Sequence, residues 1–95
     1  PFRFDLEREE LLRSTDGAES VVRLTAAEAS LLKVLAEGAG TTIGRAELLQ
    51  RSRISGNERT VDVQMTRLRR KVEADPRQPR YLQTVRGTGY VLRLG

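Results

Sequence analysis

Residues 57–92 read NERTVDVQMTRLRRKVEADPRQPRYLQTVRGTGYVL, and this stretch predicts a long helix followed by a hairpin. Its first part predicts a long helix over residues 58–74, which Asp75-Pro76 ends because the residue before a proline avoids helical backbone. Its second part contains two β-rich runs separated by Arg86-Gly87-Thr88-Gly89. Glycines permit the positive φ angles of a tight turn, so these runs predict a β-hairpin.

The helix predicted over residues 58–74 has two different faces. At 100° per residue, one band about 60° wide is wholly apolar, and its members are Val61, Met65, Leu68 and Val72. The opposite side carries Arg59, Val63, Thr66, Arg67 and Arg70. An α-helix fits the DNA major groove, and arginine is the commonest bidentate reader of guanine there. The apolar band therefore predicts the buried side of the helix, and the opposite side indicates binding to double-stranded DNA.

Further observations concern four side chains on or beside that outward side. Val63 has two interpretations, an ordinary exposed or loop-covered apolar residue and a contact to a thymine methyl group. Gln64 and Arg69 lie on the flanks, where they reach phosphates or face water. Asp62 is unusual on a helix that faces a polyanion, and we expect it to pair with a nearby arginine of the same chain.

The first half of the chain predicts a small sheet followed by a helix. Residues 2–24 contain three short strand-like runs with turn signals between them. The first run alternates Phe2, Phe4 and Leu6 with charged residues, which predicts that these three share one buried face. Thr25 and Glu28 then fit a capping box at the start of a helix, whose apolar face contains Ala27, Leu31, Leu32, Val34 and Leu35. Gly38 and Gly40 end that helix, because glycine tolerates a left-handed C-terminal cap.

A second helix completes a helix-turn-helix. It is predicted over residues 45–52 with Gly44 as its cap, and the polar loop of residues 53–57 leads into the long helix. The hairpin that follows would be a wing whose tip brings Arg86 to a narrow minor groove. An ordinary hairpin with one exposed arginine is the alternative.

Composition excludes several classes of protein. The 95 residues contain no cysteine and no histidine, which removes disulfides, thiolate sites and the commonest catalytic base and metal ligand. No apolar run is long enough to span a membrane. The net charge is +5 over residues 58–95 and −1 over residues 1–57, which favours a polyanionic partner for the C-terminal part. The chain begins at Pro1, so we expect it to be part of a longer protein.

The stretch quoted first resembles the output domain of OmpR/PhoB-type response regulators. The pattern R-x-V-D-V-x-x-x-R-L-R-x-K followed by T-V-R-G-x-G-Y is highly specific for that family, and LTAAEASLLKVLAEGAGTTIGRAELL resembles its first two helices. The resemblance implies an α+β winged helix-turn-helix domain over residues 1–95, without its receiver domain. It would have an N-terminal antiparallel sheet of four strands, three helices and a C-terminal β-hairpin wing.

The same resemblance implies a function. The chain would be the sequence-specific double-stranded DNA-binding domain of a two-component transcriptional regulator in the bacterial cytoplasm, with helix 58–74 in the major groove and wing 84–90 in the minor groove. A sensor kinase would act only through the missing receiver domain, by phosphorylating an aspartate. Pairs of molecules would bind tandem direct repeats head to tail, and the loop at residues 51–57 would meet RNA polymerase or a neighbouring subunit.

The site residues follow from matching positions in the family motif and from the exposed faces. The expected base contacts are Val63, Arg67 and Arg86. The expected contacts to the DNA backbone are Arg59, Gln64, Thr66, Arg69, Arg70, Thr84 and Thr88.

Three other functions fit the residues less well. A winged helix used only for protein–protein contact would need an apolar or acidic outward face. An RNA-binding module would need aromatic platforms, and the aromatic residues are few and lie at strand or core positions, namely Phe2, Phe4, Tyr81 and Tyr90. An enzyme would need a nucleophile–base pair or a phosphate-binding loop. We therefore expect no catalytic residue, metal site or cofactor.

Overall fold

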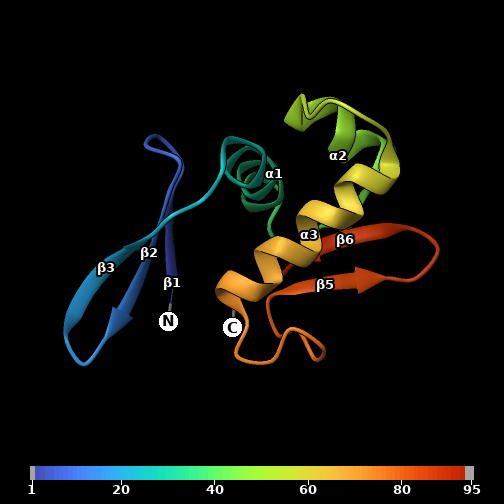
Figure 1. Cartoon of the computed structure of the whole chain (residues 1–95). Helices are drawn as coiled ribbons and strands as arrows, with labels where there is room; N and C mark the ends of the chain where they lie inside the picture. The colour runs from blue at the N-terminus through green and yellow to red at the C-terminus, as the bar shows by residue number, and fades with distance from the viewer. Residues whose placement is uncertain (1, 94–95) are drawn as a thin grey trace.

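The computed structural model describes residues 2–93, so residues 1, 94 and 95 of the predicted 1–95 domain lie outside the described part. Figure 1 shows an N-terminal sheet on one side of the helices and a C-terminal hairpin on the other. The elements in chain order are β1 (Phe2–Asp5), β2 (Glu10–Thr15), β3 (Ala18–Val22), α1 (Ala26–Glu37), β4 (Ile43–Gly44), α2 (Arg45–Ser52), α3 (Glu58–Val72), β5 (Leu82–Val85) and β6 (Gly89–Leu92). The predicted α+β helix-turn-helix with a C-terminal hairpin is confirmed.

The N-terminal sheet is antiparallel, as predicted, but within residues 2–93 it has three strands in the order β1-β2-β3 rather than four. The next strand along the chain, β4, pairs instead with β6 of the hairpin, with Ile43 opposite Tyr90. Phe2 and Phe4 pack against the core, whereas Leu6 is exposed. Leu6 differs from the prediction because the Asp5 carboxylate accepts the backbone N–H groups of Glu7 and Arg8 and starts a turn.

The first helix begins where the capping box predicts. The Thr25 hydroxyl accepts the N–H of Glu28 at 3.1 Å, and the Glu28 carboxylate accepts the N–H of Thr25 at 2.8 Å. Glu28 is buried and also accepts a hydrogen bond from Lys71 of α3 at 2.5 Å. Burial acts to raise the pKa of Glu28, but the bonds from Lys71 and Thr25 outweigh it and hold this pKa below its usual value. The contact ties the start of α1 to the end of α3.

The end of α1 differs from the expected geometry in one respect. Gly38 caps the helix with φ of −110°, outside the left-handed region, and it is Gly40 that takes a positive φ of 84°. Gly38 is close to Ile43, whose Cδ1 would lie 3.3 Å from an added Cβ. Close packing therefore favours glycine at residue 38, and backbone conformation favours it at residue 40.

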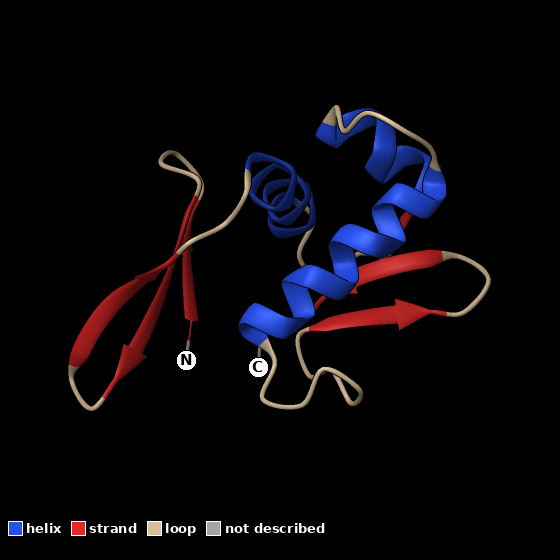
Figure 2. Ribbon diagram, in the orientation of Figure 1, coloured by secondary structure: helices blue, strands red, loops and turns tan. Residues whose placement is uncertain are grey.

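The three helices lie between the two sheets (Figure 2), and the buried apolar residues of the helices and of both sheets form one core. The apolar band predicted on α3 is confirmed, since Val61, Met65 and Leu68 are fully buried and Val72 nearly so. They pack with apolar residues of the other elements, including Leu31, Leu35, Leu48 and Leu82. Each such side chain contributes roughly 1.5–3 kcal/mol relative to exposure, so α3 is held firmly by its inner face.

Helix α3 ends at Val72, two residues before the predicted boundary at residue 74. Glu73 has extended backbone and is buried, and its carboxylate turns toward the chain that leads into β5. It accepts backbone N–H groups from Arg80 at 2.8 Å, Tyr81 at 3.0 Å and Leu82 at 2.7 Å. The side chain of Glu73 therefore takes the place of a further helical turn and fixes the start of the hairpin against α3.

The hairpin is joined to the helical core through β4. Gly89 lies opposite Gly44, and a Cβ at residue 89 would come 2.0 Å from the carbonyl oxygen of Ile43. Only glycine allows this close approach of two strands. The turn at the tip uses Gly87, whose φ is 77°.

We predict that Glu73→Gln lowers the free energy of unfolding by about 1–3 kcal/mol, because an amide supplies one fewer acceptor to three N–H groups that are buried or partly buried. Urea unfolding measures this change. Glu7→Gln is the matched control, since Glu7 is exposed, and it should change stability by less than about 0.5 kcal/mol. Equal stability of the two variants would show that the Glu73 contacts do not hold the hairpin.

Candidate nucleic-acid interface

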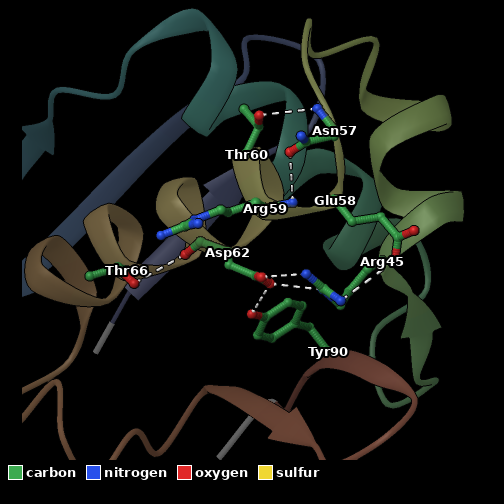
Figure 3. Close-up of polar contacts among 8 residues, drawn as sticks. All are labelled: Arg45, Asn57, Glu58, Arg59, Thr60, Asp62, Thr66 and Tyr90. Carbon is green, nitrogen blue, oxygen red and sulfur yellow. Dashed lines mark hydrogen bonds and ion pairs between the residues drawn. The ribbon is translucent and has the colours of Figure 1, made fainter.

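The first turn of α3 is fixed by its cap. The Asn57 side chain accepts the N–H of Arg59 at 3.0 Å, and the Thr60 hydroxyl accepts the N–H of Asn57 at 3.2 Å (Figure 3). This reciprocal pair satisfies donors that a helix start leaves free. The cap therefore sets where the first side chains of α3 point.

The outward side of α3 is arranged as the sequence predicts. All five predicted outward residues are exposed, namely Arg59, Val63, Thr66, Arg67 and Arg70. Val63 keeps 43% of its surface in water and lines a shallow hollow with Arg59 and Arg67. Within residues 2–93 the guanidinium groups of Arg59, Arg67 and Arg70 form no ion pair. These arginines are therefore available to a ligand.

Gln64 and Thr66, two of the expected backbone contacts, differ in how free they are. The Thr66 hydroxyl donates to the backbone carbonyl of Asp62 at 3.0 Å and keeps its acceptor capacity. Gln64 is half-buried, and its Oε1 is a buried acceptor that finds no partner in the described part of the chain. Thr66 therefore offers an exposed polar group on α3, whereas the carbonyl oxygen of Gln64 is buried.

Arg69 and Thr84, two further expected backbone contacts, are bonded to each other. The Arg69 Nη2 donates to the Thr84 hydroxyl at 2.7 Å, and its Nε donates to the carbonyl of Leu82 at 2.9 Å. The guanidinium also lies over the Tyr90 ring, 5.5 Å from its centre. Arg69 therefore connects α3 to both strands of the hairpin. This pairing had no signal in the sequence, because the partners lie 15 residues apart.

Asp62 pairs with an arginine, as expected, and the partner is Arg45 at the start of α2. Arg45 donates from Nε to Oδ1 at 3.0 Å and from Nη2 to Oδ2 at 2.5 Å. The Tyr90 hydroxyl of β6 donates to the same Oδ1 at 2.6 Å (Figure 3). Arg45 also lies 3.6 Å from a carboxylate oxygen of Glu58. One carboxylate thus joins α2, α3 and the hairpin.

These contacts change the acidity of both partners. Burial acts to raise the pKa of Asp62, but the hydrogen bonds from Arg45 and Tyr90 outweigh it, so this pKa lies below its ordinary value. Burial has the largest effect on the pKa of Tyr90, and the hydrogen bond to Asp62 has the next largest. Together they raise this pKa to about 12. Asp62 is therefore charged and Tyr90 neutral at any physiological pH.

The wing presents its tip to solvent. Arg86, Gly87 and Thr88 are exposed, and the turn is closed by the N–H of Thr88, which donates to the carbonyl of Val85 at 3.0 Å. A groove between α3 and the wing is lined by polar residues, among them Asp62 and Thr84. The two surfaces that sequence reasoning assigned to DNA, the outer side of α3 and the wing tip, are both exposed.

The comparisons with known sequences agree with this geometry. The family model described as "Transcriptional regulatory protein, C terminal" matches residues 17–92. Protein PetR of Rhodobacter capsulatus is 53% identical over 100 residues, which cover 97% of this chain and 40% of PetR. Regulatory protein VirG of Agrobacterium tumefaciens is 43% identical over 86 residues, which cover 87% of this chain and 32% of VirG. The chain thus spans less than half the length of these relatives.

Two solved structures are similar over nearly the whole chain. The DNA-binding domain of RstA from Klebsiella pneumoniae, solved in complex with the RstA box, has a TM-score of 0.78 and 30% identity, covering 97% of this chain and 90% of that one. The DNA-binding domain of the response regulator AdeR, solved in complex with an intercistronic region, has a TM-score of 0.80 and 24% identity, covering 98% and 94%. The AdeR match shows the shared fold alone.

We predict that Tyr90 ionises near pH 12, where an ordinary tyrosine ionises near pH 10. Its folded pKa is raised, so its contribution to stability is complete below pH 10 and is lost as the pH rises toward 12. The variant Tyr81→Phe leaves Tyr90 as the single tyrosine, and the ultraviolet absorbance of tyrosinate follows its titration while circular dichroism confirms that the chain is folded.

Adding Asp62→Asn to that variant should lower the midpoint, because the acceptor loses its charge. A midpoint near pH 10 in the folded Tyr81→Phe chain would contradict the buried bond between Tyr90 and Asp62.

Proposed function

The chain belongs to the OmpR/PhoB-type family of transcriptional regulatory proteins as a C-terminal DNA-binding domain, and we propose that it reads double-stranded DNA with α3 in the major groove and the wing in the adjacent minor groove. One observation carries this proposal. A helix held by a buried apolar band presents three exposed arginines that have no ion pair within residues 2–93. Free guanidinium groups on a helix suit both guanine edges and phosphates.

The exposed residues of α3 and the wing have different proposed roles. Arg67 contacts a guanine, Val63 a thymine methyl group, and Arg86 enters the minor groove, because Arg67 and Val63 are exposed at positions that match the base contacts of the family motif and Arg86 stands at the exposed wing tip. Arg59 and Arg70 contact phosphates, with Thr88 as a neutral donor to the DNA backbone. Thr66 becomes a second such donor when its hydroxyl turns from the Asp62 carbonyl to a phosphate. Gln64, Arg69 and Thr84 lie at the margins, where their contacts within the chain restrict them.

The alternative function, a protein-interaction module without DNA readout, needs an apolar or acidic outward face. The exposed side of α3 is instead rich in arginine, with Val63 as its one large apolar residue among those described. Charge and exposure therefore favour DNA. Because the family consists of DNA-binding domains, we assign no catalytic role to the chain.

The longer relatives suggest partners for a whole protein. We propose that a receiver domain, phosphorylated on aspartate by a sensor kinase, controls this domain in the bacterial cytoplasm. Two copies would bind tandem direct repeats head to tail, and the exposed loop within residues 51–57 would contact RNA polymerase. Within residues 2–93, no helix is both long and apolar enough to cross a membrane. Selection of bound duplexes from a random pool gives the motif and shows whether it is repeated.

We predict that Arg67→Ala lowers affinity for the selected duplex by about 1–3 kcal/mol and leaves affinity for random duplexes nearly unchanged, because a base contact is lost. Fluorescence anisotropy with both duplexes measures the difference. Arg77→Ala, which removes an exposed arginine from the loop after α3, is the matched control and should leave the ratio of the two affinities unchanged.

Arg59→Ala should behave differently from Arg67→Ala. Because it removes a phosphate contact, it should lower affinity for all duplexes alike and reduce the salt dependence of binding by about one ion. An equal loss on selected and random duplexes for Arg67→Ala would assign Arg67 to the phosphates instead.

We predict that Arg86→Ala removes a preference for A/T-rich sequence beside the major-groove motif, because narrow minor grooves attract arginine. The test compares duplexes that share the motif and differ only in A/T or G/C flanks. If the variant keeps the preference of the unmodified chain, the wing does not enter the minor groove.

A further inference from the structure

Asp62 is a negative charge placed where DNA should bind. It lies on α3 directly before Val63 and one turn before Thr66, and 37% of its side chain is exposed. Binding to any duplex draws on the attraction between cations and phosphates. A carboxylate at this place therefore weakens attachment to DNA of every sequence, unless it has another role.

The contacts of Asp62 suggest what that role is. Its two oxygens receive three hydrogen bonds, two from Arg45 of α2 and one from Tyr90 of β6. Tyr90 lies opposite Thr84 of the neighbouring strand β5, and Thr84 is two residues before Arg86. The Asp62 carboxylate is thus a direct link between the helix that carries Arg67 and the hairpin that carries Arg86 (Figure 3).

The link sets the distance and angle between two reading elements. Arg67 and Arg86 can act on one duplex together only if α3 and the wing keep a fixed relation. Holding that relation before binding avoids the entropy cost of ordering it on the DNA. The Arg69–Thr84 bond gives a second connection nearer the end of α3, so loss of one link should loosen the wing without unfolding it.

Asp62 also restrains Arg45. This arginine is 39% exposed at the first residue of α2, beside the groove between α3 and the wing. Held by both Asp62 oxygens and close to Glu58, it is neutralised within the chain. Released from Asp62, it would be a further mobile cation beside the DNA-facing side of α3. Specificity often depends on such suppression of binding to the wrong partner.

We propose that Asp62 is a positioning residue for sequence discrimination: it holds the wing in register with α3 through Tyr90 and withholds Arg45 from phosphates, at the expense of affinity for random DNA. This inference rests on the proposed function of α3 and the wing. Loss of the Asp62 charge should therefore raise affinity for random DNA and, at the same time, lower specificity.

The test is Asp62→Asn, measured on the selected duplex, on the same duplex with G/C flanks, and on random duplexes. The variant should bind random DNA several-fold more tightly, with salt dependence steeper by about one ion. The ratio of selected to random affinity should fall about tenfold, and the A/T flank preference should disappear. If Asp62 acts in folding alone, Asp62→Asn lowers affinity for all three duplexes together, and this result would overturn the proposal.

Two further variants divide the proposal into its parts. Tyr90→Phe keeps the carboxylate and the Arg45 pair but removes the link to the wing, so it should lose flank preference without gaining affinity for random DNA. Glu58→Gln is the matched charge control, because Glu58 lies near Arg45 yet does not contact Tyr90. It should strengthen binding to selected and random duplexes alike and leave their ratio unchanged.

The outcomes distinguish this inference from the proposed function. If the unmodified chain itself shows no preference for any duplex, the proposed function fails. If the unmodified chain discriminates and Asp62→Asn keeps the same ratio, or loses affinity for random DNA, the role of Asp62 is wrong and the proposed function stands. Should Asp62→Asn fail to fold, Tyr90→Phe decides the wing link by itself, since retained flank preference would overturn it.

Discussion

The burial of one side of α3 is the constraint on which the rest of this structure depends. Val61, Met65 and Leu68 have no exposed surface, and a rotation of α3 by one residue would turn this band through about 100° and expose it. Such a rotation would forfeit several kcal/mol of apolar burial. The exposed residues contribute little to stability, so their direction is a consequence of what lies beneath them. Arg67 faces outward because Leu68 faces inward.

Polar contacts then place the other elements around that helix. At its C-terminal end, Lys71 binds the buried Glu28 of α1, and Glu73 accepts the backbone of the chain that enters β5. Near its N-terminal end, Asp62 joins α2 and β6. Each contact pairs a charged group with donors or a counter-charge, which is the condition for partial burial. The wing is therefore held from both ends of α3 and projects only its tip.

Signals within a few residues were sufficient to predict the helices and strands. Contacts between residues far apart in the sequence could not be predicted. The capping box at Thr25, the bounds of α2 and the apolar band of α3 all depend on residues within a few positions of each other. The Asp62–Tyr90 and Glu73–Leu82 contacts join segments whose approach depends on the whole fold. For the same reason the end of α3 was predicted two residues late. The prediction of a fourth strand in the N-terminal sheet was wrong, because the next strand along the chain, β4, pairs with β6 of the hairpin.

The central claim is that the outer side of α3 and the wing tip are the surfaces that meet DNA. Nuclear magnetic resonance spectra of the arginine Nε–Hε groups test it most directly during titration with a selected duplex. The account predicts that the signals of Arg59, Arg67 and Arg86 shift, while those of Arg3 and Arg13 on the N-terminal sheet stay in place. Shifts confined to the N-terminal sheet, with Arg67 unchanged, would contradict it.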